Sequence, residues 1–196
     1  MYVEEIVRQM PIRDYNLEVR PNLKDGDFVF ASGNYRFSRQ VKRTTRSIWS
    51  HVGLIFRIEE IDRVLLLESV EFAGVRFAPF SKYLKNYRRG KPYNGMVYIA
   101  RYEVQLQDKD YKTMKQSGCD ALAWPYSWAS IAMTVGRMLT GSRKFSRELL
   151  KQHNYTCAEL VENCFSAVNI KFRKNHFATP EDFASDPNVN FLYRLL

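Results

Sequence analysis

A cysteine stands at the predicted start of a buried helix, in the stretch Tyr155-Thr156-Cys157-Ala158-Glu159. Thr156 and Glu159 have the spacing of a capping box, so we expect a helix whose first residue is Cys157. Apolar residues follow at helical spacing: Leu160, Val161, Cys164, Phe165 and Val168. The positive end of a helix dipole favours thiolate, the nucleophilic form of cysteine. The position therefore suits a catalytic nucleophile, although a small buried hydrophobic residue would fit the same pattern.

A cysteine nucleophile needs an imidazole within hydrogen-bonding reach, and the sequence offers three histidines. His153 falls in the turn before the predicted helix and His176 in a polar stretch, so we expect both to be exposed. His51 begins an otherwise apolar strand and shares a face of it with Gly53, which leaves room for a close approach. We therefore take His51 as the candidate base, with a structural core histidine as the alternative interpretation.

A carboxylate in the next predicted strand is the candidate partner of His51. Glu68 follows three leucines, and a buried carboxylate is costly unless it is paired. A four-residue loop at 59–62 would place His51 opposite Val70, with Glu68 diagonal to it on the same face. A carboxylate there would hold one tautomer of the imidazole, as the third member of a triad does. A three-residue loop would bring Glu71 opposite His51 instead, so Glu71 is the second candidate.

The composition limits the class of protein. With 196 residues, 45% of them hydrophobic, the chain can form one domain with its own core, which we assign to 1–196 with a lead-in over 1–21. The net charge of +9 favours anionic partners. Three cysteines without a C-x-x-C pair, and no His/Cys cluster at zinc spacing, predict neither a disulfide framework nor a metal site. No cofactor is needed for the chemistry outlined above.

Residues 1–10 lack the apolar segment of a secretory signal, and no run approaches the length of a membrane span. We therefore expect a cytoplasmic protein, in a reducing compartment, without a transmembrane segment. Access to a substrate outside the cell would then require lysis or another export route, as for a phage-encoded protein.

The order of predicted elements indicates an α+β fold. Strands are predicted over 28–31, 50–58, 64–70, 74–79, 95–102 and 191–195. Helices are predicted in 1–20, 35–50, 80–87, 109–123, 127–139, 146–152 and 157–168, with a last one starting at 179. Strands fill the middle of the chain and helices its second half. Cys119 and Cys164 are both expected in the core.

Four motifs in this order resemble the circularly permuted NlpC/P60-type papain-like cysteine peptidases of the YiiX/YaeF-like group. They are Lys24 to Phe30, Trp49 to Ile55, Leu66 to Ser69 and Tyr155 to Val161, and Thr179 to Phe183 resembles the tail of that group. The resemblance covers roughly residues 22–186. It implies an antiparallel, barrel-like sheet with the cysteine helix packed against it.

The resemblance also implies roles for single residues. Cys157 would be the nucleophile, His51 the base and Glu68 the orienting group of a hydrolase that cleaves amide bonds in peptides, including cell-wall-type peptides. Tyr155, Trp49 and Tyr126 stand in or beside the motifs and are the candidate substrate-binding residues. The stretch before the cysteine departs from the Gly-Lys-Pro-Tyr-Asp-like form of the group, because Ala123 to Ser127 keeps only Pro-Tyr.

Two other functions fit the same residues. Lipid acyl hydrolysis or transfer would use the same triad, with a basic segment on an anionic membrane surface. That segment consists of Arg36, Arg39, Lys42, Arg43 and Arg46. A non-catalytic module that binds an anionic ligand would also explain the charge, although a solvated helix face is the simpler interpretation of the segment. No motif indicates specific nucleic-acid binding.

Overall fold

The computed structural model describes residues 3–127, 154–172 and 178–196. Its strands are β1 (Phe28–Gly33), β2 (His51–Ile58), β3 (Arg63–Val70), β4 (Gly74–Pro79), β5 (Gly95–Tyr102) and β6 (Val189–Arg194). Its helices are α1 (Val3–Gln9), α2 (Arg36–Thr45), α3 (Ser81–Lys85), α4 (Asp108–Asp120), α6 (Cys157–Ser166) and α7 (Pro180–Ala184), with short helical turns η1 (Tyr15–Val19), η2 (Arg20–Asn22) and η3 (Glu59–Ile61). The described residues do not include His153 or His176. They also do not include the helices predicted over 127–139 and 146–152, except for Ser127.

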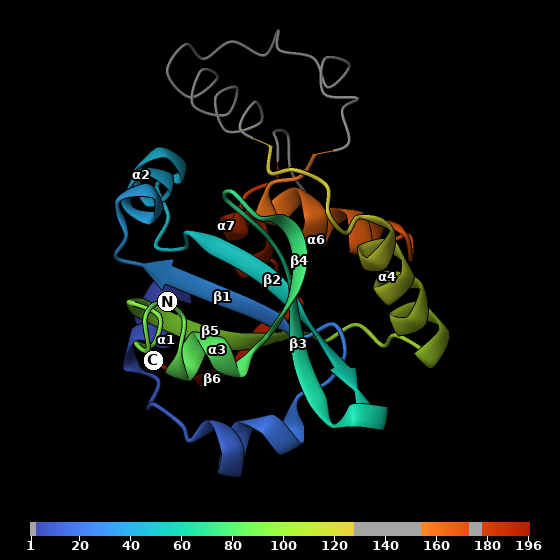
Figure 1. Cartoon of the computed structure of the whole chain (residues 1–196), viewed down its shortest axis with the longest axis horizontal. Helices are drawn as coiled ribbons and strands as arrows, with labels where there is room; N and C mark the ends of the chain where they lie inside the picture. The colour runs from blue at the N-terminus through green and yellow to red at the C-terminus, as the bar shows by residue number, and fades with distance from the viewer. Residues whose placement is uncertain (1–2, 128–153, 173–177) are drawn as a thin grey trace, which may run out of the picture.

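The six strands form one antiparallel sheet in the order β4-β3-β2-β1-β5-β6 (Figure 1). β1 lies at the centre of the sheet, where apolar residues of Phe28–Gly33 are buried on both faces. The predicted α+β class and the antiparallel sheet are confirmed. The sheet is open, with β4 and β6 at its edges, so it does not close into a barrel.

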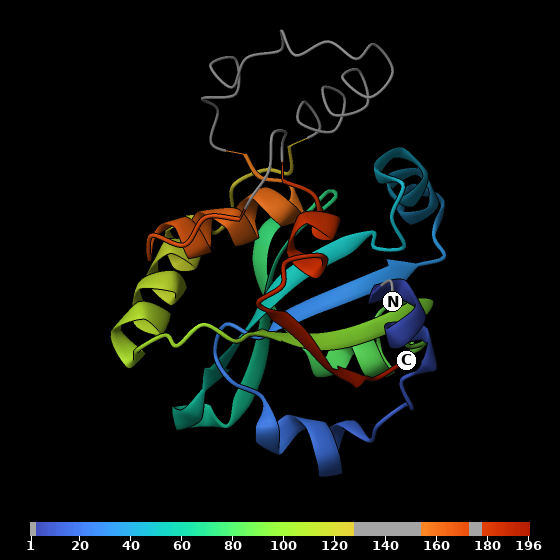
Figure 2. The ribbon, with the colours of Figure 1, turned by 180° about the vertical axis from the view of Figure 1, so that it is seen from behind.

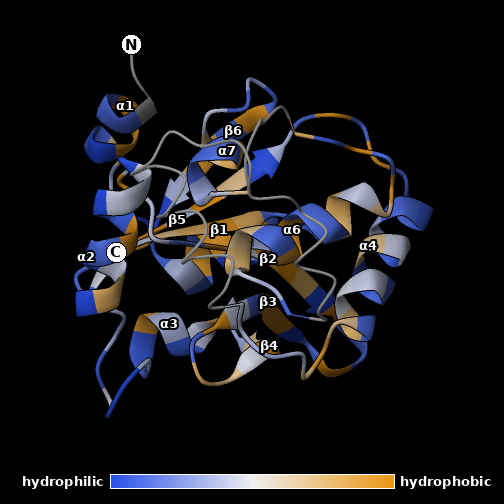
Figure 3. Ribbon diagram, turned by 90° about the horizontal axis from the view of Figure 1, so that it is seen from above, coloured by the Kyte–Doolittle hydropathy of each residue, from blue (hydrophilic) through white to orange (hydrophobic). Residues whose placement is uncertain are grey.

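Alternating side chains of the strands build two separate cores, one on each face of the sheet. Val52, Leu54 and Phe56 of β2 pack on the face that α6 and α7 cover. Ile55 of β2 packs on the other face, with Tyr83 of α3. Figure 1 shows α3 in front of the sheet, and Figure 2 shows α6 and α7 in front after the molecule is turned. The apolar colour of Figure 3 runs along the strands between these helices.

The register of the β2–β3 hairpin is the predicted one. Ile58 pairs with Arg63 and Leu54 with Leu67, so four residues, 59–62, connect the strands. This register directs His51 and Glu68 to the same face of the sheet. No helix of the described ranges is both long and apolar enough to cross a membrane.

The close packing of α4 on the sheet explains why the core position predicted for Cys119 is wrong. Gly118 faces β3, where an added Cβ would lie 2.4 Å from Cδ2 of Leu67. The next residue of a helix points about 100° away. Cys119 is therefore exposed, whereas Cys164 of α6 is buried as predicted.

Candidate active site

Cys157 is the first residue of α6, as the capping box predicts. The Thr156 hydroxyl accepts a hydrogen bond from the Glu159 N–H at 3.2 Å, and the Glu159 carboxylate accepts one from the Thr156 N–H at 2.8 Å. Cys157 is 7% exposed. The cap thus fixes a nearly buried thiol at the positive end of the helix dipole.

Glu68 is the carboxylate that holds His51. Its Oε2 lies 3.0 Å from Nε2 of His51, and its side chain is fully buried. Oε2 also accepts a hydrogen bond from the Tyr83 hydroxyl, while Oε1 pairs with Nε and Nη2 of Arg76 at 3.0 and 2.9 Å. β3 ends at Val70, and no hydrogen bond in the described residues joins Glu71 to His51. The geometry therefore supports Glu68, the first candidate, as the partner of His51.

The electrostatics of the pair favour a charged imidazole. Burial opposes protonation of His51, but hydrogen bonds with Cys157 and Glu68, and the negative charges of both groups, raise its pKa from 6.5 to about 10. Burial alone would raise the pKa of Glu68, yet its bond to His51 and its contacts with Tyr83 and Arg76 lower it. His51 can therefore keep a proton beside Cys157 and the buried Glu68 carboxylate.

Two hollows meet at this pair. A small one is lined by Cys157 and presents a mainly apolar surface, to which Val41, Ala158, Ala178 and Pro180 contribute. A larger cleft of about 700 Å³ is lined by His51 and by Tyr and Arg side chains. Phe37, Ser50 and Tyr126 line both. Cys157 and His51 thus stand between an apolar hollow on the sulfur side and a polar cleft on the imidazole side.

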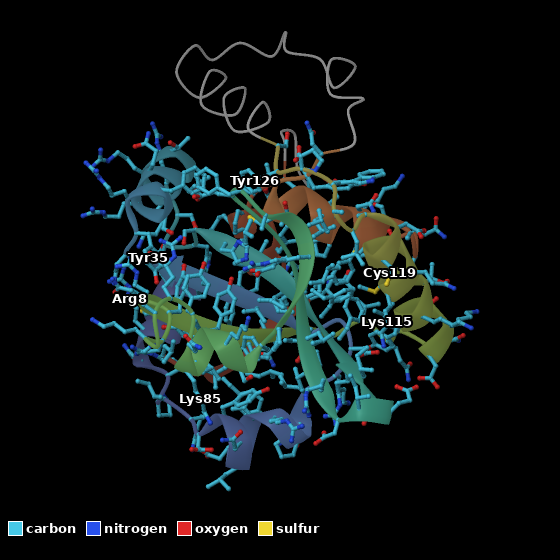
Figure 4. The ribbon with its side chains drawn as sticks, viewed as in Figure 1. Arg8, Tyr35, Lys85, Lys115, Cys119 and Tyr126 are labelled. Carbon is cyan, nitrogen blue, oxygen red and sulfur yellow. The ribbon has the colours of Figure 1, made fainter. Side chains whose placement is uncertain are left out.

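The three predicted substrate-binding residues lie in different places. Tyr126 lines both hollows and lies between α2 and α6 in Figure 4. The Tyr155 ring instead stacks on Trp124, with centroids 5.4 Å apart, and lines a separate hollow beside α4. Trp49 is 1% exposed and packs against Phe30 and Phe191, because its position in β2's lead-in directs it into the core. Tyr126 therefore lines the hollows at Cys157 and His51, whereas Tyr155 and Trp49 line neither of them.

Sequence reasoning missed three residues that position the site. Ser69, next to Glu68, donates a hydrogen bond of 2.6 Å to the carbonyl oxygen of Tyr155, and so ties β3 to the lead-in of α6. Arg76 pairs with Glu68 across the β3–β4 ladder, a position that the short 71–73 turn could have indicated. Tyr83 reaches Glu68 from α3, and no local sequence signal points to that long-range contact.

The basic segment forms the outer face of α2. Arg36, Arg39 and Arg43 have helical spacing and are exposed, as is Arg46 just beyond the helix. Lys42 departs from the prediction, because its Nζ lies 3.2 Å from Oγ of Ser32 and burial lowers its pKa. The opposite face of α2 lines the small hollow through Phe37, Val41 and their neighbours.

Comparisons with known proteins show which fold and family this chain resembles. A search of curated protein sequences gives no match. A solved structure, described as metalloprotein yiiX from Escherichia coli O157:H7, has the same fold, with a TM-score of 0.55 and 16% identity over 87% of this chain and 88% of that one. In the described part of the present chain, no three His, Cys, Asp or Glu side chains gather as metal ligands would.

A family profile settles the resemblance that the motifs suggested. The profile of the permuted papain-like amidase enzymes, YaeF/YiiX, C92 family, matches residues 22–193. That range contains β1 to β5, α6 and all three residues of the Cys157–His51–Glu68 arrangement. The chain therefore belongs to the YaeF/YiiX family of permuted papain-like amidases.

Proposed function

We propose that this chain hydrolyses an amide bond of a peptide-type substrate with Cys157 as nucleophile, His51 as acid and base, and Glu68 as the group that orients His51. The observation that carries the proposal is the position of His51, whose Nε2 lies 3.0 Å from the buried Glu68 carboxylate and whose pKa is raised in part by its interaction with Cys157. Nucleophile, base and orienting carboxylate in hydrogen-bonding sequence are the geometric signature of acyl-transfer catalysis.

The reaction proceeds in two halves. The thiol proton passes to His51, and the Cys157 sulfur attacks the carbonyl carbon to form a tetrahedral intermediate. The bond to nitrogen then breaks as His51 gives its proton to the leaving amine, which leaves an acyl-thioenzyme. Water, deprotonated by His51, attacks the thioester and releases the acid and the free thiol. Glu68 holds the imidazole in place and stabilises its charged form throughout.

The start of α6 can supply the donors for the oxyanion. The capping box uses the N–H groups of Thr156 and Glu159, and the N–H of Leu160 bonds to the Thr156 carbonyl. The N–H groups of Cys157 and Ala158 have no hydrogen-bond partner among the described residues. Both belong to the first helical turn, where N–H groups lack intrahelical acceptors. They are the natural donors to the developing oxyanion.

Thiol reactivity tests the proposed pair directly. We expect iodoacetamide to modify Cys157 well below pH 8, as measured by mass spectrometry of peptides. Cys164 should stay unmodified, because burial raises its pKa to about 12. Cys119 is exposed and serves as the comparison thiol. His51→Ala should abolish the early reaction of Cys157. Equal and slow modification of Cys157 and Cys119, with or without His51, would exclude the pair.

Capture of the acyl-enzyme extends the test to the reaction. Incubation with a library of N-acetyl dipeptides should give a mass adduct on Cys157 and a new acid product, and Cys157→Ala should give neither. Early alkylation of Cys157 without any adduct or product across amide substrates would refute amide hydrolysis while keeping the pair.

Acyl chemistry on lipids is the second candidate, and two observations favour it. The hollow beside Cys157 is mainly apolar, and the arginines of α2 face outward beside it. Anionic headgroups would attract that face, and an acyl chain would enter the hollow. Release of fatty acid from vesicles rich in phosphatidylglycerol, with no product from the peptide library, would select this function.

A further inference from the structure

The larger cleft differs from the hollow beside Cys157 in both charge and shape. Aromatic rings form much of its wall, and three arginines, Arg36, Arg76 and Arg88, line it together with a single carboxylate, that of Glu71. Figure 4 places Tyr35 below α2 and Tyr126 between α2 and α6, and both rings line the cleft. The cleft therefore combines flat apolar walls with an excess of fixed positive charge.

The chemistry of the reaction decides which half of a substrate this cleft receives. The imidazole must reach the leaving nitrogen to give it a proton, while the sulfur keeps the acyl carbon. The amine half therefore departs on the His51 side. His51 lines the larger cleft and Cys157 lines the smaller hollow. The arginines are thus placed around the leaving amine and not around the acyl group.

Arg88 is held in place without being neutralised. Its guanidinium carbon lies 4.9 Å from the centroid of Tyr35 and 5.9 Å from that of Tyr87. No acidic side chain within the described ranges forms an ion pair with it. Glu71 is near enough for the Arg88 charge to oppose the effect of burial, which raises the pKa of Glu71. A stacked guanidinium keeps its in-plane N–H donors for a ligand.

The backbone of Arg88 is fixed independently of its side chain. Its N–H donates to the Lys91 carbonyl at 3.3 Å and its carbonyl accepts from the Lys91 N–H at 3.0 Å. Arg76 adds a second positive group, since its side chain is 42% exposed and only Nε and Nη2 contact Glu68. A planar anion bound by these guanidinium groups would neutralise part of the positive charge of the cleft.

We propose that the amine half of the substrate carries a carboxylate, which Arg88 binds with support from Arg76. The leaving product is then an amino acid or a short peptide with a free carboxylate. This inference rests on the proposed function for the direction of the substrate. The binding of the carboxylate itself can be measured without any reaction.

A matched pair of substrates tests the proposal. N-acetyl dipeptides that end in alanine are compared with their carboxamides, with the first residue varied, and alanine or alaninamide release is measured. We expect the acids to have kcat/KM about tenfold or more above the amides, as for a hydrogen bond to a charged group. Arg88→Gln should raise KM for the acids, keep kcat and leave the amides unchanged. Arg88→Lys should recover part of the preference.

Arg89→Gln is the matched control, because Arg89 is exposed, adjacent in sequence and absent from the lining of the cleft. It removes the same charge and should retain the full preference. Equal cleavage of acids and amides by the wild type would overturn the proposal, as would an equal loss for both with Arg88→Gln. Thermal unfolding of each variant separates misfolding from lost binding.

Binding to Cys157→Ala distinguishes this proposal from the function on which it rests. The inert protein should bind the acids more tightly than the amides in equilibrium dialysis, and an added Arg88→Gln should remove the difference. A preference without hydrolysis in the wild type would refute the proposed reaction and retain the carboxylate site. Hydrolysis without any preference in either assay would refute the carboxylate site alone.

Discussion

Replacement of Glu68 by Gln separates the orienting role of the carboxylate from its place in the packing. The two side chains have nearly the same shape, so the change removes a charge from a fully buried position. Glu68 lies 3.0 Å from His51, and its hydrogen bond and charge help to raise the pKa of His51 to about 10. Burial lowers the pKa of His51. When the residue at 68 is neutral, only Cys157 remains to counteract that effect of burial.

The sign of the pH effect follows from the role as acid that is proposed for His51. In the wild type, kcat/KM should fall as the pH rises through the pKa of His51, about 10, because neutral His51 has no proton for the leaving amine. A hydrogen bond between charged groups contributes about 1.5–3 kcal/mol, which corresponds to about one to two pH units. Glu68→Gln should therefore shift the basic limb of the pH profile, where kcat/KM falls as the pH rises, to a lower pH by that amount. It should also lower kcat roughly 10- to 150-fold.

Stability should change less than for a fully buried ion pair. Removing one member of such a pair costs about 3–5 kcal/mol. The Arg76 side chain is 42% exposed and can be hydrated when Glu68 is neutral. We therefore expect Glu68→Gln to reduce the free energy of unfolding by about 1–3 kcal/mol, measured by urea denaturation.

Glu71→Gln provides the comparison, because it removes the same charge nearby without removing a hydrogen bond to His51. Its basic limb should move much less than that of Glu68→Gln. If both variants shifted the basic limb equally, the summed negative charge around His51, and not the hydrogen bond to Glu68, would explain its pKa. If neither moved it, Glu68 would have no orienting role, and the reasoning would be refuted.

Three further substitutions test the scaffold of the site. Thr156→Ala removes the acceptor of the Glu159 N–H and should cost about 1 kcal/mol of unfolding free energy, whereas Thr156→Ser should keep it, as seen by thermal denaturation. Ser69→Ala removes the hydrogen bond to the Tyr155 carbonyl and should reduce the free energy of unfolding by about 1 kcal/mol. A loss of stability without a loss of activity would show that this hydrogen bond does not align α6. Gly53→Ala would set a Cβ 2.6 Å from the carbonyl oxygen of Leu67 and should cost about 1–3 kcal/mol; an unchanged denaturation midpoint would contradict the close approach of β2 and β3.

Local rules predicted the positions of Cys157, His51 and Glu68, because those positions depend on residues that are close together along the chain. A capping box depends on residues three apart, so Thr156 and Glu159 located Cys157 at the start of α6. The side-chain period of two, with a four-residue loop, placed Glu68 on the face of His51. In both cases the residues concerned are close together along the chain.

The surroundings of the site depend on contacts between distant segments, which a pattern does not encode. The hydroxyl of Tyr83 reaches Glu68 from another element. Trp49 lies beside His51 in sequence, yet the packing of Phe30 and Phe191 makes it a core residue. Cys119 was predicted to lie in the core, but Gly118 faces Leu67 of β3 and the adjacent Cys119 is exposed. In each case the sequence shows a suitable residue, but the tertiary packing decides its environment.

The division of the core between the two faces of the sheet makes catalysis sensitive to sliding of one layer over the other. Cys157 belongs to the core beneath α6, whereas Glu68, which holds His51, is bonded to Tyr83 in the core beneath α3. A displacement of α6 along the sheet would separate sulfur from imidazole while both cores stayed dry. The proposed amide hydrolysis therefore depends on the alignment of the two layers. Heating should abolish it at a lower temperature than the one that unfolds the strands.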